Sequence, residues 1–150
     1  VGIAAETVAR LVKNRNVLGV KEAAGSVERV SEILSLCDTS IMCGDDSLTV
    51  PMMLLGAKGV ISVASNIIPA ELKKMTDACA SGDFMTAVAM HRKYWRLFKD
   101  LFVESNPIPV KAAMAMLGMI EEEYRLPLCP LSDVNREKLR KTVSECIRSV

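Results

Sequence analysis

The chain has 150 residues with a formal net charge of +1, and 50% of them are hydrophobic, which is enough for one compact core. Its lysines and arginines are scattered along the sequence, so the concentrated basic surface typical of nucleic-acid binding is not expected. No apolar run reaches the roughly 18 residues that a membrane span needs, so no membrane partner is expected either.

The cysteine pattern argues against a metal or disulfide framework. The five cysteines have long, irregular spacings without a Cys-x-x-Cys pair, and His91 is the only histidine. We therefore expect no metal site and no disulfides, but free thiols in a reducing cytoplasm. The five are Cys37, Cys43, Cys79, Cys129 and Cys146.

The first part of the sequence alternates helix-like and strand-like segments. Short apolar runs predict strands over residues 16–21, 40–43 and 59–64. Apolar residues at helical spacing predict helices over 6–13, 27–37 and 48–55, and a further helix from Pro69. Continuous apolar strands are typical of parallel strands covered on both faces by helices. The alternation therefore predicts an α/β fold, either a (β/α)8 barrel or a doubly wound sheet.

The second part is expected to be helical. A long amphipathic helix follows the break at 81–83, a second helix runs from Val110 to Gly118 after a bend at 106–109, and a last one begins near Ser132 or Asp133. The long helix is expected to pack through the stripe Phe84, Val88, His91, Trp95, Phe98 and Phe102, and the last one through Leu139, Val143 and Ile147. We expect two domains, residues 1–81 and 82–150.

Three parallel strands with their helices cannot close a barrel. A (β/α)8 barrel needs about 250 residues, and a three-stranded sheet would leave both of its edges unpaired. We therefore expect the sheet of this chain to pair with strands that the chain does not contain.

Lys21 is the candidate for chemistry. It ends the apolar run 17–20, and folds with parallel strands place their active sites at the carboxyl ends of the strands. Desolvation at such a place disfavours the ammonium form, so that the neutral amine becomes available to attack a carbonyl. The alternative is a lysine that reaches solvent or pairs with Glu22, and position alone favours this alternative.

An ordered series of motifs, which begins with the segment around Lys21, favours the chemical role of this lysine over the alternative. The series is Gly19-Val20-Lys21-Glu22-Ala23-Ala24-Gly25, Cys43-Gly44-Asp45-Asp46, Gly59-Val60-Ile61-Ser62-Val63, Phe102-Val103-Glu104-Ser105-Asn106-Pro107-Ile108-Pro109-Val110-Lys111 and Arg125-Leu126-Pro127-Leu128. Together these motifs resemble the dihydrodipicolinate synthase (4-hydroxy-tetrahydrodipicolinate synthase) family, and the first of them resembles its Schiff-base segment. Because the matches keep their order over nearly the whole chain, they are much more specific than any one motif.

The resemblance implies the last three strands of a (β/α)8 barrel followed by a C-terminal helical domain, in a homotetramer. It implies a lyase that condenses pyruvate with L-aspartate 4-semialdehyde in lysine biosynthesis. Lys21 would form the imine with pyruvate, and Gly44 and Ile61 would line the pyruvate pocket, Ile61 partly through its backbone. No metal or organic cofactor is implied, because the lysine itself supplies the electron sink.

Other residues of the family have no counterpart in this sequence. The family's paired threonines, its proton-relaying tyrosine and the arginine that holds the semialdehyde carboxylate all belong to its first half, and Tyr94 and Tyr124 do not match the catalytic tyrosine. The chain thus corresponds to about the second half of the enzyme, and we expect it not to complete the full reaction alone.

Two other functions remain open. One is a different pyruvate-dependent aldolase, such as N-acetylneuraminate lyase or a keto-acid aldolase, which would share the lysine but differ in the aldehyde. The other is a non-catalytic half-barrel that binds a partner through its open sheet edges.

Asp45 and Asp46 are expected to cap the helix that follows them, and not to bind a metal. His91 is expected to be a packed, structural histidine.

Overall fold

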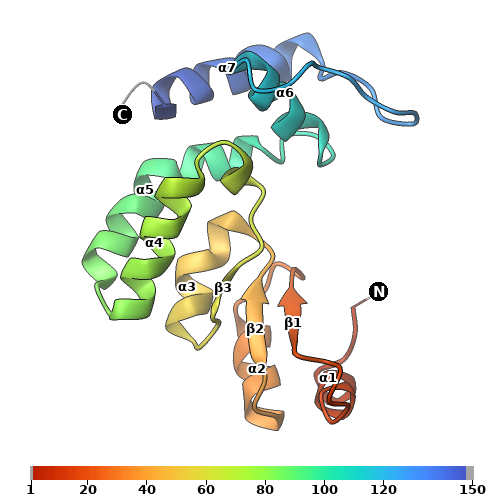
Figure 1. Ribbon diagram of the computed structural model, residues 1–150, viewed down its shortest axis with the longest axis vertical. Helices are drawn as coiled ribbons and strands as arrows, with labels where there is room; N and C mark the ends of the chain where they lie inside the picture. Colours follow the sequence, from red (N-terminus) through yellow and green to blue (C-terminus); the bar gives the residue numbers. More distant parts are fainter. Residues whose placement is uncertain (1, 148–150) are drawn as a thin grey trace.

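In the computed structural model, which describes residues 2–147, three short strands form a parallel sheet (Figure 1). The strands β1 (Gly19–Glu22), β2 (Ser40–Cys43) and β3 (Gly59–Val60) lie in the order β1-β2-β3. In the register of the sheet, Lys21 stands opposite Met42, and Met42 stands opposite Gly59. The prediction of an α/β chain with three parallel strands is confirmed.

The third strand is shorter than expected, because only residues 59 and 60 are strand. The amide of Ile61 still donates to the carbonyl of Cys43, but the chain then turns into the 3₁₀ helix η2 (Ala64–Asn66). The amides of Val63 and Ala64 donate to the carboxylate of Asp46 and not to a neighbouring strand. A side chain far away in the sequence therefore ends β3 early, which an apolar run cannot reveal.

Helices cover one face of the sheet. The helices on this side are α1 (Ala5–Leu11), α2 (Glu28–Leu36) and α3 (Thr49–Leu54), and α3 follows the 3₁₀ helix η1 (Asp46–Leu48). Val30 and Ile33 of α2 pack with Ile41 and Cys43 of β2 in one core cluster. On the opposite face Lys21 and Ser40 are exposed and Met42 is half-buried. The expectation that helices cover both faces is therefore wrong for residues 2–147.

The helices α4 (Pro69–Ser81) and α5 (Phe84–Asp100) form an antiparallel pair beside α3 (Figure 1). Pro69 is the first residue of α4, as predicted. Gly82 adopts a left-handed conformation with φ +81°, which a residue with a side chain rarely takes. Asp83 then caps α5 by accepting the amide of Thr86 at 3.1 Å, so the predicted break at 81–83 is confirmed.

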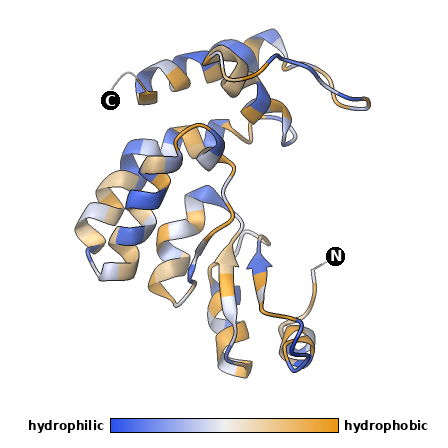
Figure 2. Cartoon of the chain, in the orientation of Figure 1, coloured by the Kyte–Doolittle hydropathy of each residue, from blue (hydrophilic) through white to orange (hydrophobic). Residues whose placement is uncertain are grey.

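The buried face of α5 is not the predicted one. Figure 2 shows apolar residues on more than one side of this helix. Both apolar stripes have the same spacing of three and four residues, and the contacts of α5 with α4 and α7 (Asp133–Ile147) decide which of them is buried. The buried apolar residues are Ala87, Met90, Tyr94, Leu97 and Phe98. Of the predicted stripe only Phe98 is buried, while Phe84, Val88, Trp95 and Phe102 are exposed and His91 is half-buried.

The last two helices, α6 (Ile108–Met116) and α7, lie beyond the end of the sheet toward which the strands point (Figure 1). The bend expected at 106–109 is shorter than predicted, because α6 already begins at Ile108 and Pro109 lies in its first turn. The start of α7 at Asp133 is as expected. Its buried residues include Leu139 and Val143, with Cys146 buried more deeply than Ile147.

A second core cluster joins the two halves of the chain. It contains Leu72 and Met75 of α4 together with Leu97 of α5 and Leu139 of α7. A domain boundary after residue 81 therefore stays a prediction. Among residues 2–147, no helix is both long and apolar enough to span a membrane.

Candidate active site

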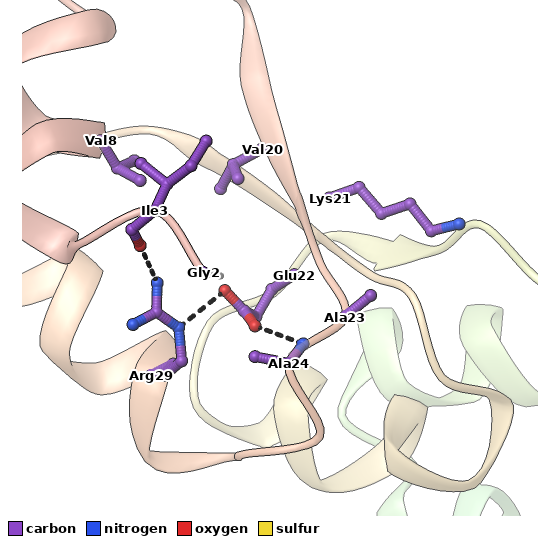
Figure 3. A pocket seen from close by; sticks show the side chains of 9 residues that line it. All are labelled: Gly2, Ile3, Val8, Val20, Lys21, Glu22, Ala23, Ala24 and Arg29. Atoms are coloured by element: carbon purple, nitrogen blue, oxygen red, sulfur yellow. Dashed lines mark hydrogen bonds and ion pairs between the residues drawn. The ribbon is translucent and has the colours of Figure 1, made fainter.

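Lys21 lies on the open face of the sheet, near the carboxyl end of β1. It is the third residue of the strand, and its side chain extends away from Glu22 and Arg29 (Figure 3). The side chain is exposed and has no ion-pair partner among the described residues. The desolvation expected of this lysine is therefore not supplied by residues 2–147.

Gly44 and Ile61 lie two residues further toward the carboxyl end of the sheet than Met42 and Gly59, the positions level with Lys21. The amide of Gly44 donates to the carbonyl of Glu22 at 2.8 Å, and the amide of Ile61 donates to that of Cys43 at 2.8 Å. The strand-like hydrogen bonding thus continues for one residue beyond β2 and β3. Because side chains alternate along strands, positions 44 and 61 lie on the same face as Lys21. The structure brings all three candidate residues together.

Gly44 is constrained by the packing around Lys21. A Cβ atom at position 44 would lie 2.5 Å from the Cβ of Ala23 and 2.9 Å from the Cε of Lys21. Neither distance is compatible with van der Waals contact between carbon atoms. A glycine at this position therefore leaves room for the stem of the lysine.

The neighbour of Lys21, Glu22, is held on the opposite side of the strand. Its carboxylate is 4% exposed, accepts the Nε–H of Arg29 at 3.1 Å and accepts the amide of Ala24 at 2.8 Å (Figure 3). Arg29 also donates to the carbonyl of Ile3 at 2.7 Å. Glu22 therefore does not pair with Lys21, because alternation places the two side chains on opposite faces. Sequence reasoning missed the pair of Glu22 and Arg29; alternation alone could have indicated only that Glu22 and Lys21 lie on opposite faces.

A pocket of about 380 Å³ lies along the outer edge of β1. Ile3 and Val20 supply apolar atoms to its lining, Glu22 and Arg29 supply polar ones, and Lys21 is also among the lining residues (Figure 3). No other described strand pairs with this edge. The pocket thus marks the side of β1 on which a further strand would lie.

Asp46 is a buried carboxylate between the ends of β2 and β3. It is 1% exposed, and one oxygen, Oδ2, accepts the amides of Val63 and Ala64, both at 3.0 Å. The other oxygen, Oδ1, is buried without a hydrogen-bond partner in the described part of the chain. Burial raises the pKa of Asp46 above its ordinary value.

The prediction that Asp45 and Asp46 cap the helix that follows them is wrong. Asp45 occupies the N-cap position of η1, but its side chain makes no capping hydrogen bond. The carboxylate of Asp46 reaches the amides at the start of η2 instead. Within residues 2–147, no group of three or more histidine, cysteine or acidic side chains could hold a metal ion.

His91 lies outside this region, on α5. Its ring contacts that of Phe98 with the centroids 6.2 Å apart, and burial lowers the pKa of the imidazole. The Nδ1 atom is buried without a hydrogen-bond partner among the described residues. This environment is that of a packed histidine, as predicted.

Residues 1–146 match the model of the Dihydrodipicolinate synthetase family. The chain belongs to this family. It is 53% identical over 142 residues to the 4-hydroxy-tetrahydrodipicolinate synthase of a Sulfurihydrogenibium species, covering 92% of this chain and 48% of that protein.

Solved structures of the dihydrodipicolinate synthetase family agree closely with the fold. The enzyme from Methylacidiphilum fumariolicum SolV superposes with a TM-score of 0.95 at 45% identity, covering 97% of this chain and 50% of that one. The chloride-inhibited enzyme from Acinetobacter baumannii, solved in complex with pyruvate, gives a TM-score of 0.91 at 37% identity, covering 95% and 50%. The chain therefore spans about half the length of the relatives it matches.

Proposed function

We propose that this chain is the C-terminal half of a 4-hydroxy-tetrahydrodipicolinate synthase, in which Lys21 forms an imine with pyruvate for condensation with L-aspartate 4-semialdehyde in lysine biosynthesis. The observation that carries this proposal is the place of Lys21 on the open face of the sheet, so close to Gly44 that a Cβ atom at position 44 would lie 2.9 Å from the Cε of the lysine. Membership of the dihydrodipicolinate synthetase family and the pyruvate complex of the Acinetobacter relative support it.

The proposed architecture follows from the same family. Residues 1–81 would supply the last three strands of a (β/α)8 barrel and residues 82–150 the helical domain, in a full enzyme that is a cytoplasmic homotetramer. The uncovered face of the sheet supports this proposal, because the inner face of a barrel is covered by side chains of the other strands and not by helices.

The chemistry begins at the Nζ atom of Lys21. The neutral amine adds to the keto carbon of pyruvate; the hydroxyl group of the adduct then takes up a proton and leaves as water, so that a protonated imine remains. This imine withdraws electrons from the adjacent methyl carbon, which loses a proton and becomes a nucleophile. The resulting enamine then attacks the aldehyde carbon of the second substrate. The lysine thus provides the electron sink, so the route needs no separate cofactor.

Gly44 and Ile61 would form the wall against which pyruvate lies. A glycine at position 44 leaves space beside the Lys21 stem, where a methyl group would collide with Cε. Ile61 follows β3, its side chain is 48% exposed, and its carbonyl is near the reacting end of the sheet. Both positions lie on the face that carries Lys21, which supports a shared pocket.

Desolvation of Lys21 would come from the strands that close the open face. Since Lys21 is exposed within residues 2–147, the chain alone lacks the low-polarity surroundings that favour a neutral amine. We therefore expect slow imine formation by the chain alone and no complete turnover until the other half of a relative is supplied.

The experiment that tests this function has two stages. The chain is first incubated with pyruvate and borohydride, and an adduct on Lys21 is expected by mass spectrometry. The chain is then mixed with the complementary half of the Sulfurihydrogenibium relative and assayed with both substrates; condensation is expected in the mixture, and not with either half alone. Absence of the adduct would contradict the imine role, and condensation only with a different aldehyde would indicate another pyruvate aldolase.

A non-catalytic half-barrel is favoured by one observation, the unpaired outer edges of β1 and β3 among the described residues. Such a protein would bind a partner through these edges. Failure of the chain to form an adduct, together with tight association with the complementary half, would support this second candidate.

A further inference from the structure

We propose that Asp46 is a positioning residue, whose buried carboxylate fixes the loop 61–64 and holds Ile61 in place beside Lys21. The role in pyruvate binding rests on the function proposed above. Asp46 itself is buried, and in this proposal it acts through the loop and does not touch the substrate.

The loop is fixed at both of its ends. At its start, the amide of Ile61 donates to the carbonyl of Cys43 at 2.8 Å. At its end, the amides of Val63 and Ala64 donate to Oδ2 of Asp46, both at 3.0 Å. Only the Ile61 carbonyl and Ser62 lie between these anchors, so the direction of that carbonyl depends on both of them. The anchor at Cys43 belongs to the sheet, whereas the one at Asp46 depends on a single side chain.

Asp46 also couples this loop to the turn that carries Gly44. It follows Gly44 by two residues and begins η1, so its backbone belongs to the segment that leaves β2. The carboxylate then reaches across to the segment that leaves β3. One side chain therefore adds a second connection, besides the backbone hydrogen bond from Ile61 to Cys43, between the two strand ends on which the proposed pyruvate pocket is built.

The burial of the Asp46 carboxylate supports a specific role as a hydrogen-bond acceptor for the loop. Asp46 is 1% exposed, and the groups that interact with its carboxylate are the side chain of Ser62 and the amides of Val63 and Ala64. Burying a carboxylate is unfavourable, and an apolar side chain would avoid that penalty. An apolar side chain would also leave two amides without an acceptor at the end of β3.

The first test measures how well the amides of Val63 and Ala64 are protected. Hydrogen exchange is compared in the unaltered chain, Asp46→Ala, Asp46→Asn and Asp45→Ala. The last variant is the control, because the side chain of Asp45 makes no capping hydrogen bond in the unaltered chain. Asp46→Ala is expected to speed exchange at both amides by about tenfold or more, because their acceptor is removed. Asp46→Asn keeps an oxygen at the same place and is expected to restore protection, and Asp45→Ala is expected to leave it unchanged.

The second test links the loop to pyruvate. Adduct formation on Lys21 is measured at increasing pyruvate concentrations in the same variants. Asp46→Ala is expected to raise the concentration for half-maximal adduct formation with little change in the maximum, and Asp46→Asn is expected to return it toward the original value. A merely structural role would lower the amount of folded protein in all assays without this shift.

The outcomes separate the two proposals. Unchanged exchange at Val63 and Ala64 in Asp46→Ala would overturn the positioning role, whatever the chain does with pyruvate. If the unaltered chain forms no adduct, the proposed function fails for this chain, while the exchange data still decide whether Asp46 holds the loop. If Asp46→Ala does not fold, Asp46→Ser replaces it, because its hydroxyl is too short to reach both amides.

Discussion

Gly44 lies so close to Lys21 that a Cβ atom at position 44 would stand 2.9 Å from the Cε of the lysine. The two residues come from neighbouring strands and meet on the face of the sheet that helices leave uncovered. The glycine is not required by its backbone, because it is not among the glycines with positive φ. It is required by the space that the lysine and Ala23 occupy.

Gly44→Ala is therefore expected to destabilise the chain and disturb the lysine. The added methyl would be 2.5 Å from the Cβ of Ala23, and relief of such a contact needs a backbone shift that costs about 1–3 kcal/mol. Urea unfolding gives the free energy, and borohydride trapping with pyruvate gives the loss of adduct. The double variant Ala23→Gly with Gly44→Ala is expected to recover stability. Equal stability of Gly44→Ala and the unaltered chain would contradict the steric account.

The pair Glu22–Arg29 is expected to support the strand that carries Lys21. Glu22→Gln keeps the shape of the side chain but weakens the hydrogen bond from Arg29, and we expect a loss of about 1–2 kcal/mol in unfolding free energy. Glu28→Gln, on the exposed surface of α2, is the matched control and should have little effect. A double-mutant cycle with Arg29→Ala separates the pair from other contacts. A coupling energy near zero would mean that the pair contributes nothing measurable.

The three strands and the place of Lys21 near the end of one of them could be predicted from the sequence. Short apolar runs, and a charged residue at the end of a run, are local features of the sequence. The pairing of Glu22 with Arg29 could not be predicted, since it depends on which face of β1 the helices cover. The face of α5 was also mispredicted. Two apolar stripes of equal spacing run along that helix, and only the positions of α4 and α7 decide that Tyr94 is buried and Trp95 is exposed.

Asp46 is expected to make stability fall as pH rises through the mildly acidic range. Burial raises the pKa of this carboxyl, so the folded chain binds its proton more tightly than the unfolded chain does. The resulting stability is complete below the ordinary carboxyl pKa of about 4 and is lost as pH rises through the higher folded value. Asp46→Asn cannot titrate and is expected to lack this loss. Urea midpoints at a series of pH values test it; parallel curves for both proteins would contradict the assignment.

Glu104 is expected to give the opposite pH dependence, with stability that falls as pH falls. Hydrogen bonds from Asn135 and Ser132 lower the pKa of its carboxyl, so it stabilises the start of α7 above the ordinary carboxyl pKa. This stabilisation is lost as pH falls through the lowered folded value. Glu104→Gln is expected to lower the Tm at neutral pH and to flatten the acid side of the stability curve. Glu137→Gln, an exposed residue of α7, is the control and should leave that side unchanged.

The identity of the reacting lysine is the most direct test of the proposed function. The chain is treated with pyruvate and borohydride, digested, and each lysine peptide is weighed, with Lys21→Arg and Lys58→Arg treated in parallel. Lys58 is an exposed lysine directly before β3, at the other end of the sheet, so it controls for non-specific modification. The account predicts one reduced pyruvate adduct on Lys21, retained in Lys58→Arg and lost in Lys21→Arg. An adduct that persists in Lys21→Arg, or none in the unaltered chain, would contradict it.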